Sequence, residues 1–268
     1  MEKVKVFLAD WQVLFREGIH LTLSGEEDIE VIGEATNNEE ALAFIETNPP
    51  RVAILNVDHS QPSGIEVTRR LKQSFPSVAV ILVMDSESEE QLFSAMKSGA
   101  SAYLTKDIDP EEMVNIIRKV AQGGYPISER LLRPRLASLV LDEFEAFSII
   151  SEQLNNLLAR LTPGEAEILR RIADRNSIEQ VSAAAEVCQA VGISEQAIRY
   201  QLELILSKLV ANDHNREVIE AAQSNMVLTI IRQGFRTRQA SKPEYVTKDE
   251  FTAFKESIGE RLKSFMAS

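Results

Sequence analysis

The first half of the chain alternates short apolar runs with segments of helical periodicity. This alternation is typical of β-α-β units around a parallel sheet. Helix starts fall between the runs, at Asn37 with Glu40 three residues later and at Asp109 before Pro110. The pattern predicts an α/β doubly wound parallel sheet whose functional residues lie at the carboxyl ends of the strands. We expect buried strands at Val4–Ala9, Val31–Glu34, Val52–Val57, Val78–Met84 and Ala102–Leu104.

The 268 residues exceed what a typical single domain holds, so two domains with linkers are expected. Gly123-Gly124-Tyr125-Pro126 closes the α/β part, and helical patterns follow it. We predict four segments: the α/β domain at residues 1–127, a helical linker at 128–160, an all-α domain at 161–225, and a basic segment with a C-terminal amphipathic helix at 226–268.

The third segment shows a helix-turn-helix pattern. Thr162, Pro163 and Glu165 predict a capping box that opens one helix, and Gly192 with Ser194 predicts a turn before a second helix, Glu195–Leu209. An ordinary small helical bundle is the alternative explanation of the same pattern.

Two further segments carry apolar stripes that require burial. In the linker, the stripe could pack on its own domain or pair with a second protomer, and both possibilities are open; it comprises Leu136, Val140, Phe144, Phe147, Leu154, Leu157 and Leu158. Near the C-terminus, Thr247 and Glu250 predict a capping box. The helix that follows must dock on the body or on a partner through Phe251, Phe254, Ile258, Leu262 and Phe265.

Composition excludes several classes of protein. The net charge is −12, with most of the acidic excess in the first 128 residues, so charge alone does not indicate nucleic-acid binding. One cysteine, Cys188, allows neither an internal disulfide nor a cysteine-cluster metal site, and we expect it to be a buried structural thiol. No apolar run is long enough to span a membrane, so we expect a cytoplasmic protein.

Nothing in the sequence predicts an enzyme, a metal ion or a cofactor. His20, His59 and His214 fall in different elements and form no metal or triad spacing. No phosphate-binding or dinucleotide-binding glycine loop is present in the sequence.

Several segments within residues 3–128 resemble the receiver domains of NarL/LuxR-type response regulators: VKVFLADW, LFREGI, DIEVIGEA, EEALAFIE, GIEVTRRLK, SAMKSGASAYLTKD and PEEMVNIIRKVAQGG. The resemblance implies a phosphorylation switch. In that family, two acidic residues after the first strand hold Mg²⁺, and an aspartate that ends the third strand accepts the phosphoryl group. A hydroxyl residue after the fourth strand and a lysine after the fifth then contact the phosphate.

Position by position, this sequence retains only part of that site. The first acid and the lysine remain, while the second acid, the acceptor and the hydroxyl residue are replaced; the corresponding residues are Asp10, Trp11, Asn56, Met84 and Lys106. Tyr103 corresponds to the aromatic residue that often moves on switching. An amide is no nucleophile for phosphoryl transfer, and one carboxylate is a poor start for Mg²⁺, which prefers several. The resemblance therefore implies a degenerate receiver, or pseudo-receiver.

Two explanations of the remaining residues are open. Asp10, Asn56 and Lys106 could form a fixed hydrogen-bonded network, which a buried lysine would need. They could equally be leftovers of a lost site. A different register would make Asp58 the acceptor, because Pro62 follows it by four residues, but the gapless match favours Asn56.

Residues 161–222 resemble the DNA-binding domain of the same family. LTPGEAEILRRIA matches its first helix and GISEQAIRYQLELILSKL its turn and recognition helix, with about six extra residues between them. We expect Ile198, Leu202, Ile205 and Leu209 to face inward. The candidate DNA-binding residues are Ser194, Gln196, Arg199, Tyr200 and Lys208, with Arg232, Arg236 and Arg238 of the basic segment.

The sequence thus predicts an atypical, phosphorylation-independent response regulator that binds DNA as a dimer and regulates transcription. The alternative is a protein-interaction regulator whose degenerate helix-turn-helix and C-terminal helix bind another protein. The acidic balance, Glu203 on the recognition helix and the extra residues favour that alternative. An ordinary phosphorylation switch is the third hypothesis.

Overall fold

The computed structural model describes residues 3–58, 61–150, 158–175, 185, 187–189 and 191–236. Side chains are not described for residues 147–150 and 216–236. Several predictions therefore lie outside the described residues: the positions of His59 and Arg238, those of Leu154 and Leu157 in the linker stripe, and the C-terminal amphipathic helix with Phe251 and Phe265.

Five parallel strands form one sheet in the order β2-β1-β3-β4-β5. The strands are β1 (Val4–Ala9), β2 (Ile29–Ala35), β3 (Val52–Asn56), β4 (Ala79–Met84) and β5 (Ala102–Thr105). All residues of β3 and β4 are buried, as expected for central strands covered on both faces. The predicted α/β doubly wound fold is confirmed, with strand ends that differ from the prediction by one or two residues.

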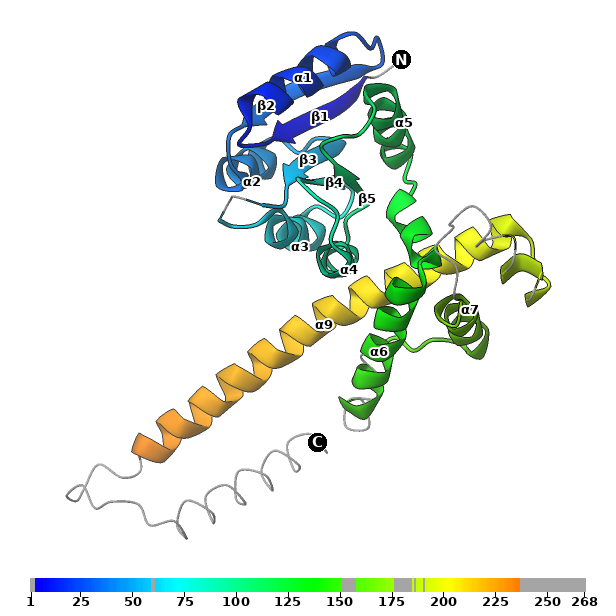
Figure 1. Ribbon diagram of the computed structural model, residues 1–268. Helices are drawn as coiled ribbons and strands as arrows, with labels where there is room; N and C mark the ends of the chain where they lie inside the picture. The colour runs from blue at the N-terminus through cyan, green and yellow to red at the C-terminus, as the bar shows by residue number, and fades with distance from the viewer. Residues whose placement is uncertain are drawn as a thin grey trace. The chain divides into compact units, whose positions relative to one another are not determined.

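Helices cover both faces of the sheet (Figure 1). On one face, Val6 and Leu8 of β1 share a core cluster with Ile19 and Ile117 of α1 and α5. On the other face, Phe7 lies in a cluster with residues of α2, α3 and α4. The helices are α1 (Val13–Ser24), α2 (Asn38–Thr47), α3 (Gly64–Ser74), α4 (Glu89–Ser98) and α5 (Pro110–Ala121).

The predicted helix starts coincide with observed caps. The Asn37 side chain accepts a hydrogen bond from the Glu40 N–H at the start of α2, and Asp109 caps α5. A 3₁₀ helix, η1 (Pro126–Leu132), then leads into α6 (Pro134–Ile150) and α7 (Pro163–Ala173), which begins with the capping box of Thr162 and Glu165. Local side-chain capping thus determines where these helices begin.

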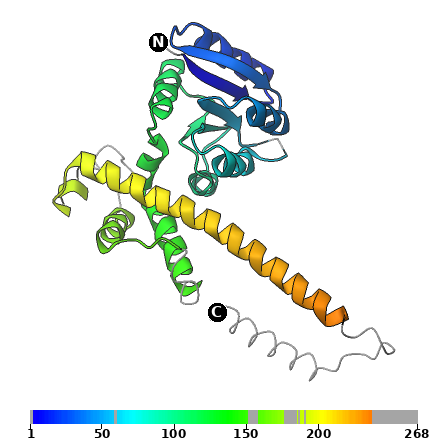
Figure 2. The same cartoon turned by 180° about the vertical axis from the view of Figure 1, so that it is seen from behind.

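The described part of the linker stripe packs on its own chain. Leu136 and Val140 of α6 are fully buried and share one apolar cluster with Leu92 of α4, Leu169 of α7 and Leu202. Figure 2 shows α7 beside α6, on the side away from the sheet. The α/β part and the helical part, up to Val218, are therefore joined by a continuous core rather than by an open linker.

The last described helix differs from the prediction. The helix expected to end at Leu209 continues as α9 (Glu195–Arg236), so the predicted boundary between residues 225 and 226 falls inside it. Residues 210–233 contain neither glycine nor proline, and nothing in the sequence interrupts the backbone hydrogen bonds there.

The chain divides into two compact units, Met1–Val218 and Ile219–Ser268; of the second unit, the structure describes only the backbone of α9. None of the described helices is long and apolar enough to span a membrane. Cys188 is half-buried rather than buried, in contrast to the expectation for a core thiol.

Candidate functional site

Polar side chains meet at the carboxyl ends of β1, β3 and β5, as a parallel sheet requires. Asp10 follows β1, Asn56 ends β3 and Lys106 follows β5. The Asp10 side chain is 1% exposed and Asn56 is 2% exposed. The sheet therefore brings these three predicted residues together in one place.

Asp10 is the centre of this cluster. Its Oδ2 accepts a hydrogen bond from Asn56 Nδ2 at 2.7 Å, and its Oδ1 accepts one from the Gln12 backbone N–H at 2.7 Å. The Lys106 ammonium lies 3.2 Å from Asp10 Oδ1 and 3.1 Å from Oδ2. A buried carboxylate is thus paired with a cation and hydrogen-bonded on both oxygens, which offsets the free-energy cost of its burial.

Two further residues of this cluster, Asp85 and Asn38, were not predicted from the sequence. Asp85 Oδ1 lies 2.9 Å from Lys106 Nζ, and Asn38 Nδ2 donates to the Asn56 carbonyl at 2.8 Å. Asp85 directly follows β4, so the rule that functional residues lie at strand ends could have identified it. Asn38 belongs to α2, and no sequence signal connects it with β3.

Aromatic and apolar side chains surround the lysine. Lys106 Nζ lies 5.4 Å from the ring centroid of Trp11 and 5.2 Å from that of Phe15, within the range of cation–π attraction. Met84 is fully buried and offers no hydroxyl donor at the end of β4. Tyr103 is buried too, and burial raises the pKa of its hydroxyl to about 12. A neutral phenol is therefore expected there at physiological pH.

The residues present do not fit Mg²⁺. This hard cation requires several oxygen ligands in near-octahedral array, and carboxylates supply most of them in proteins. Here the Asp10 carboxylate already faces the Lys106 ammonium and the Asn56 amide N–H. No group of three or more His, Cys, Asp or Glu able to hold a metal occurs among the described residues. The other candidate acceptor, Asp58, accepts a hydrogen bond from Gln91 Nε2 of α4 at 3.0 Å.

The second predicted site lies on the first turns of α9. The Ser194 hydroxyl caps this helix by accepting from the Ala197 N–H at 3.2 Å. The inward stripe of Ile198, Leu202, Ile205 and Leu209 is fully buried, as predicted. Gln196, Arg199 and Glu203 are exposed, and Tyr200 is 59% exposed. This face of the helix thus presents a mixed polar surface.

The basic residues of that helix are engaged within the chain. Arg199 forms ion pairs with Glu195, at 2.8 Å, and with Glu129 of η1. Lys208 Nζ lies 2.7 and 2.6 Å from the two oxygens of Glu165, a residue that is 2% exposed. Burial opposes ionisation of Glu165, but the contacts with Lys208 and Thr162 outweigh it and lower its pKa. Lys208 therefore has a structural contact at the position where the sequence suggested a phosphate contact.

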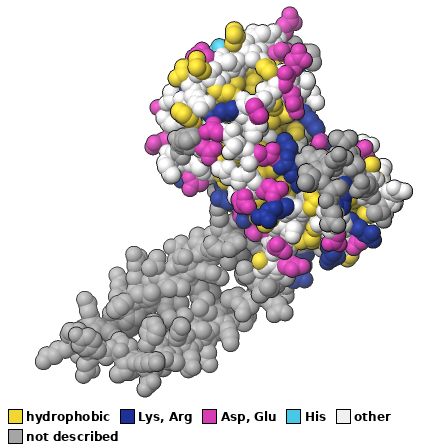
Figure 3. All heavy atoms as spheres, in the orientation of Figure 1, with side chains coloured by type: hydrophobic (Ala, Val, Ile, Leu, Met, Phe, Trp, Pro, Cys, Tyr) yellow, Lys and Arg dark blue, Asp and Glu magenta, His cyan; other side chains and the backbone are white. Residues whose placement is uncertain are grey.

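Arg232 and Arg236 lie on the last turns of α9, where only the backbone is described. On the face drawn in Figure 3, basic side chains are interspersed with acidic ones over the described surface. The described part of that face thus offers no continuous positive track for a phosphate backbone.

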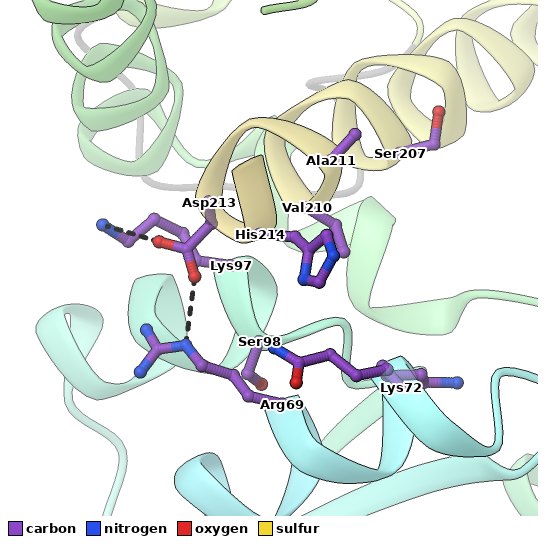
Figure 4. Close-up of a pocket in the computed structure, with 10 residues that line it drawn as sticks. Arg69, Lys72, Lys97, Ser98, Ser207, Val210, Ala211, Asp213 and His214 are labelled. Carbon is purple, nitrogen blue, oxygen red and sulfur yellow. Dashed lines mark hydrogen bonds and ion pairs between the residues drawn. The ribbon is translucent and has the colours of Figure 1, made fainter. Parts of the chain in front are cut away.

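Ion pairs tie α9 to the sheet domain (Figure 4). Asp213 of α9 accepts a hydrogen bond from Arg69 Nε of α3 at 3.0 Å and lies 3.7 Å from Lys97 Nζ of α4. Lys97 also donates to Glu143 of α6 at 2.9 Å. Beside them, a cavity of about 320 Å³ is lined by α3, α4 and α9, and His214 lies at its wall.

Comparison with known proteins supports the receiver assignment. Residues 6–118 match the family model described as "Response regulator receiver domain". The chain is 28% identical over 231 residues to the transcriptional regulatory protein DegU of Brevibacillus brevis, which covers 84% of this chain and 95% of that protein. It is 25% identical to the response regulator protein VraR of Staphylococcus aureus, with 84% and 99% covered.

Among solved structures, a DNA-binding response regulator of the LuxR family from Staphylococcus aureus is 24% identical, with a TM-score of 0.42, over 44% of this chain and 98% of that one. The family match thus supports a receiver domain at residues 6–118. These two relatives are named as a transcriptional regulatory protein and a response regulator, not as enzymes, which agrees with the prediction that the chain is not an enzyme.

Proposed function

We propose that this protein is a response regulator that works without phosphorylation and controls transcription by binding DNA as a dimer. The relatives DegU and VraR, which are covered over nearly their whole length, support a regulator of this architecture. Along the chain, the receiver domain comes first and the capped helix α9 follows it, which is the order that the sequence predicts for the receiver and DNA-binding domains. An input other than phosphorylation then controls the activity of the protein.

The observation that carries the proposal is that both carboxylate oxygens of Asp10 already have partners within the chain. Its two oxygens are shared among Asn56, the Gln12 backbone and Lys106, so they are not available to a divalent cation. Asn56 has no carboxylate oxygen to attack a phosphoryl donor, and Met84 cannot donate a hydrogen bond to the product. Each of these three residues separately blocks the phosphorylation chemistry.

Phosphorylation independence is tested with acetyl phosphate and with beryllofluoride, each in the presence of Mg²⁺. We expect neither reagent to change the near-ultraviolet spectrum of the protein, its oligomeric state or its DNA affinity. A Mg²⁺-dependent change that is lost in the Asp58→Asn variant would show that Asp58 is the acceptor and would overturn the proposal.

DNA binding is tested by selection from random duplexes at moderate salt, followed by footprinting. We expect an inverted repeat whose half-sites are about one helical turn apart, because two symmetry-related α9 helices would enter successive major grooves. Gln196→Ala should relax the preference at one base position and cost about 1–3 kcal/mol of binding free energy. Failure to select any sequence would count against the proposal.

A second candidate function is protein binding through the same helical region. The ion pairs of Arg199 with Glu129 and Glu195, together with exposed Glu203, favour it because they reduce the positive charge available for DNA. In that case, the full chain would bind a specific protein partner, and Tyr200→Ala would abolish that binding. Selection from random DNA would then give no preferred sequence.

A further inference from the structure

A second group of polar residues lies at the opposite end of the sheet, at the amino ends of β3 and β5. Arg51 directly precedes β3, Lys72 lies on α3, and Ser101 directly precedes β5. Together with Ser77 and the turn after α5, these residues line a cavity of about 210 Å³. We propose that this cavity binds a small oxyanion, either inorganic phosphate or the phosphate group of a small metabolite.

Neither cation of the cavity forms an ion pair with a carboxylate in the described part of the chain. Arg51 donates from Nε to the Ala121 carbonyl at 2.6 Å and from Nη1 to the Ser77 carbonyl at 3.5 Å. Lys72 Nζ donates to the Val78 carbonyl at 2.7 Å. The cavity lining in the described part of the chain contains these two cations and no Asp or Glu. The carbonyl groups accept hydrogen bonds from Arg51 and Lys72, but they do not neutralise the positive charges of these two side chains, which repel each other.

Donors remain available at both cations. A guanidinium has five N–H groups and an ammonium has three, and only some of them are used here. Figure 4 shows the Lys72 side chain extending away from Asp213, so the carboxylate of α9 does not neutralise it. An oxyanion between Arg51 and Lys72 would accept charge-assisted hydrogen bonds from both.

Ser101 adds a hydroxyl donor to the lining of this cavity. It is 2% exposed, and its backbone N–H and carbonyl are bonded to Val80 and Ile127. Its side chain lines the cavity, and its hydroxyl is not among the buried side-chain atoms that lack a hydrogen-bond partner. A hydroxyl at this position can donate a hydrogen bond to a ligand oxygen in the cavity.

The electrostatics of Lys72 agree with this arrangement. Burial, together with the nearby Arg51 charge, lowers the pKa of its ammonium to about 8. An anion between the two cations would relieve both effects, because it attracts the charged form.

The volume restricts the class of ligand. Pockets that enclose drug-sized molecules span about 300–1,000 Å³. A cavity of about 210 Å³ is smaller, and it suits a phosphate with its water or a short phosphorylated molecule. It lies away from Asp10 and Asn56, which belong to the carboxyl ends of the strands, so it is distinct from the degenerate phosphorylation site.

Titration calorimetry of the full chain in phosphate-free buffer at neutral pH tests the proposal. The probes are inorganic phosphate and glycerol phosphate. We expect saturable binding of one anion per chain with a dissociation constant of about 1 mM or tighter. Tighter binding of glycerol phosphate would indicate a phosphorylated metabolite, and equal binding would indicate the free ion.

Two variants locate the binding. Lys72→Gln and Ser101→Ala should each weaken it by about tenfold, which corresponds to about 1.4 kcal/mol. Ser101→Ala retains every charge and gives the test even if Lys72→Gln folds poorly. Arg70→Gln is the matched control, because Arg70 lies exposed on the same helix outside the cavity, and it should bind like the parent chain.

Absence of saturable binding would overturn the proposal, and it would mean that Arg51 and Lys72 only cap backbone carbonyls. Binding that all three variants weaken equally would also overturn it, because it would reflect the general charge of the surface.

Discussion

At the scale of single residues, Asn56 and Lys106 both stabilise the buried carboxylate of Asp10. Lys106 supplies the opposite charge, and Asn56 supplies a hydrogen bond. Asn56 Nδ2 donates to Asp10 Oδ2, while Asn56 Oδ1 is buried without a hydrogen-bond partner among the described residues. The amide is therefore held with its donor toward Asp10, and a carboxylate at position 56 would face Asp10 with a second negative charge.

We expect Asn56→Asp to lower the free energy of unfolding by about 2 kcal/mol at neutral pH, because it replaces a buried hydrogen bond by repulsion between like charges. Urea denaturation followed by circular dichroism measures this. Asn115→Asp makes the same chemical change on the exposed face of α5 and should have little effect. Equal stabilities of the two variants would show that Asp10 does not need the amide.

Lys72 makes stability depend on pH in the alkaline range. Its pKa is about 8 in the folded chain and 10.5 as the reference value, so the unfolded chain binds more protons between these limits. The free energy of unfolding therefore rises with pH between about 8 and about 10.5 as far as Lys72 is concerned. Below about pH 8, the charged and buried Lys72 destabilises the folded chain to its full extent.

Consequently, we expect Lys72→Met to be stabilised relative to the parent by the greatest amount near neutral pH, up to about 3 kcal/mol before the loss of the Val78 hydrogen bond is subtracted. That advantage should shrink as pH approaches 10. Urea midpoints across this range measure it, and a difference that does not vary with pH would contradict the lowered pKa.

At the scale of elements, α9 separates structural residues from exposed ones. Lys208 and Glu165 join α9 to the start of α7, and Asn212 is fully buried and bonded to both backbone groups of Ala159. Gln196 and Tyr200 are exposed in the first two turns of the same helix. One helix thus holds the helical part together and also presents exposed polar side chains.

This separation predicts opposite effects of two substitutions. Lys208→Met leaves the buried Glu165 without its cation and should cost about 3 kcal/mol of stability. Gln196→Ala should leave stability unchanged within about 0.5 kcal/mol, because it removes only an exposed side chain. Thermal unfolding measured in the absence of DNA distinguishes them, and a stable Lys208→Met chain would contradict the structural role of the pair.

At the scale of the whole described molecule, the receiver domain and the helical part up to Val218 share one core. The junction adds the ion pairs of Asp213 with Arg69 and Lys97, and each of these three side chains is mostly buried. Shared burial favours cooperative unfolding, because neither part can lose its packing alone.

We expect calorimetry to show one unfolding transition for the unit Met1–Val218 within the full chain. Asp213→Asn should lower its midpoint, at a cost of about 1–2 kcal/mol, because Arg69 and Lys97 each lose the charged contact with this carboxylate. Glu203→Gln, on the exposed face of the same helix, is the control and should leave the midpoint nearly unchanged. Two separate transitions in the parent chain would contradict the shared core.

The local pattern determined much of this protein. Alternating apolar runs predict the five strands, and the capping residues Asn37, Asp109, Thr162 and Ser194 predict where helices begin, since both depend on interactions between residues close in sequence. The positions of Asp10, Asn56 and Lys106 at strand ends follow from the parallel sheet.

Only the tertiary structure decided the partners of these residues. Asp85 on Lys106, Glu129 on Arg199 and Asp213 on Arg69 join residues distant in sequence, and no periodicity encodes such pairs. The linker stripe could have paired with another chain, but packing in one cluster with α4, α7 and α9 buries Leu136, Val140 and Phe144 within this one. An apolar face specifies that burial is needed, whereas the fold alone specifies which surface supplies it.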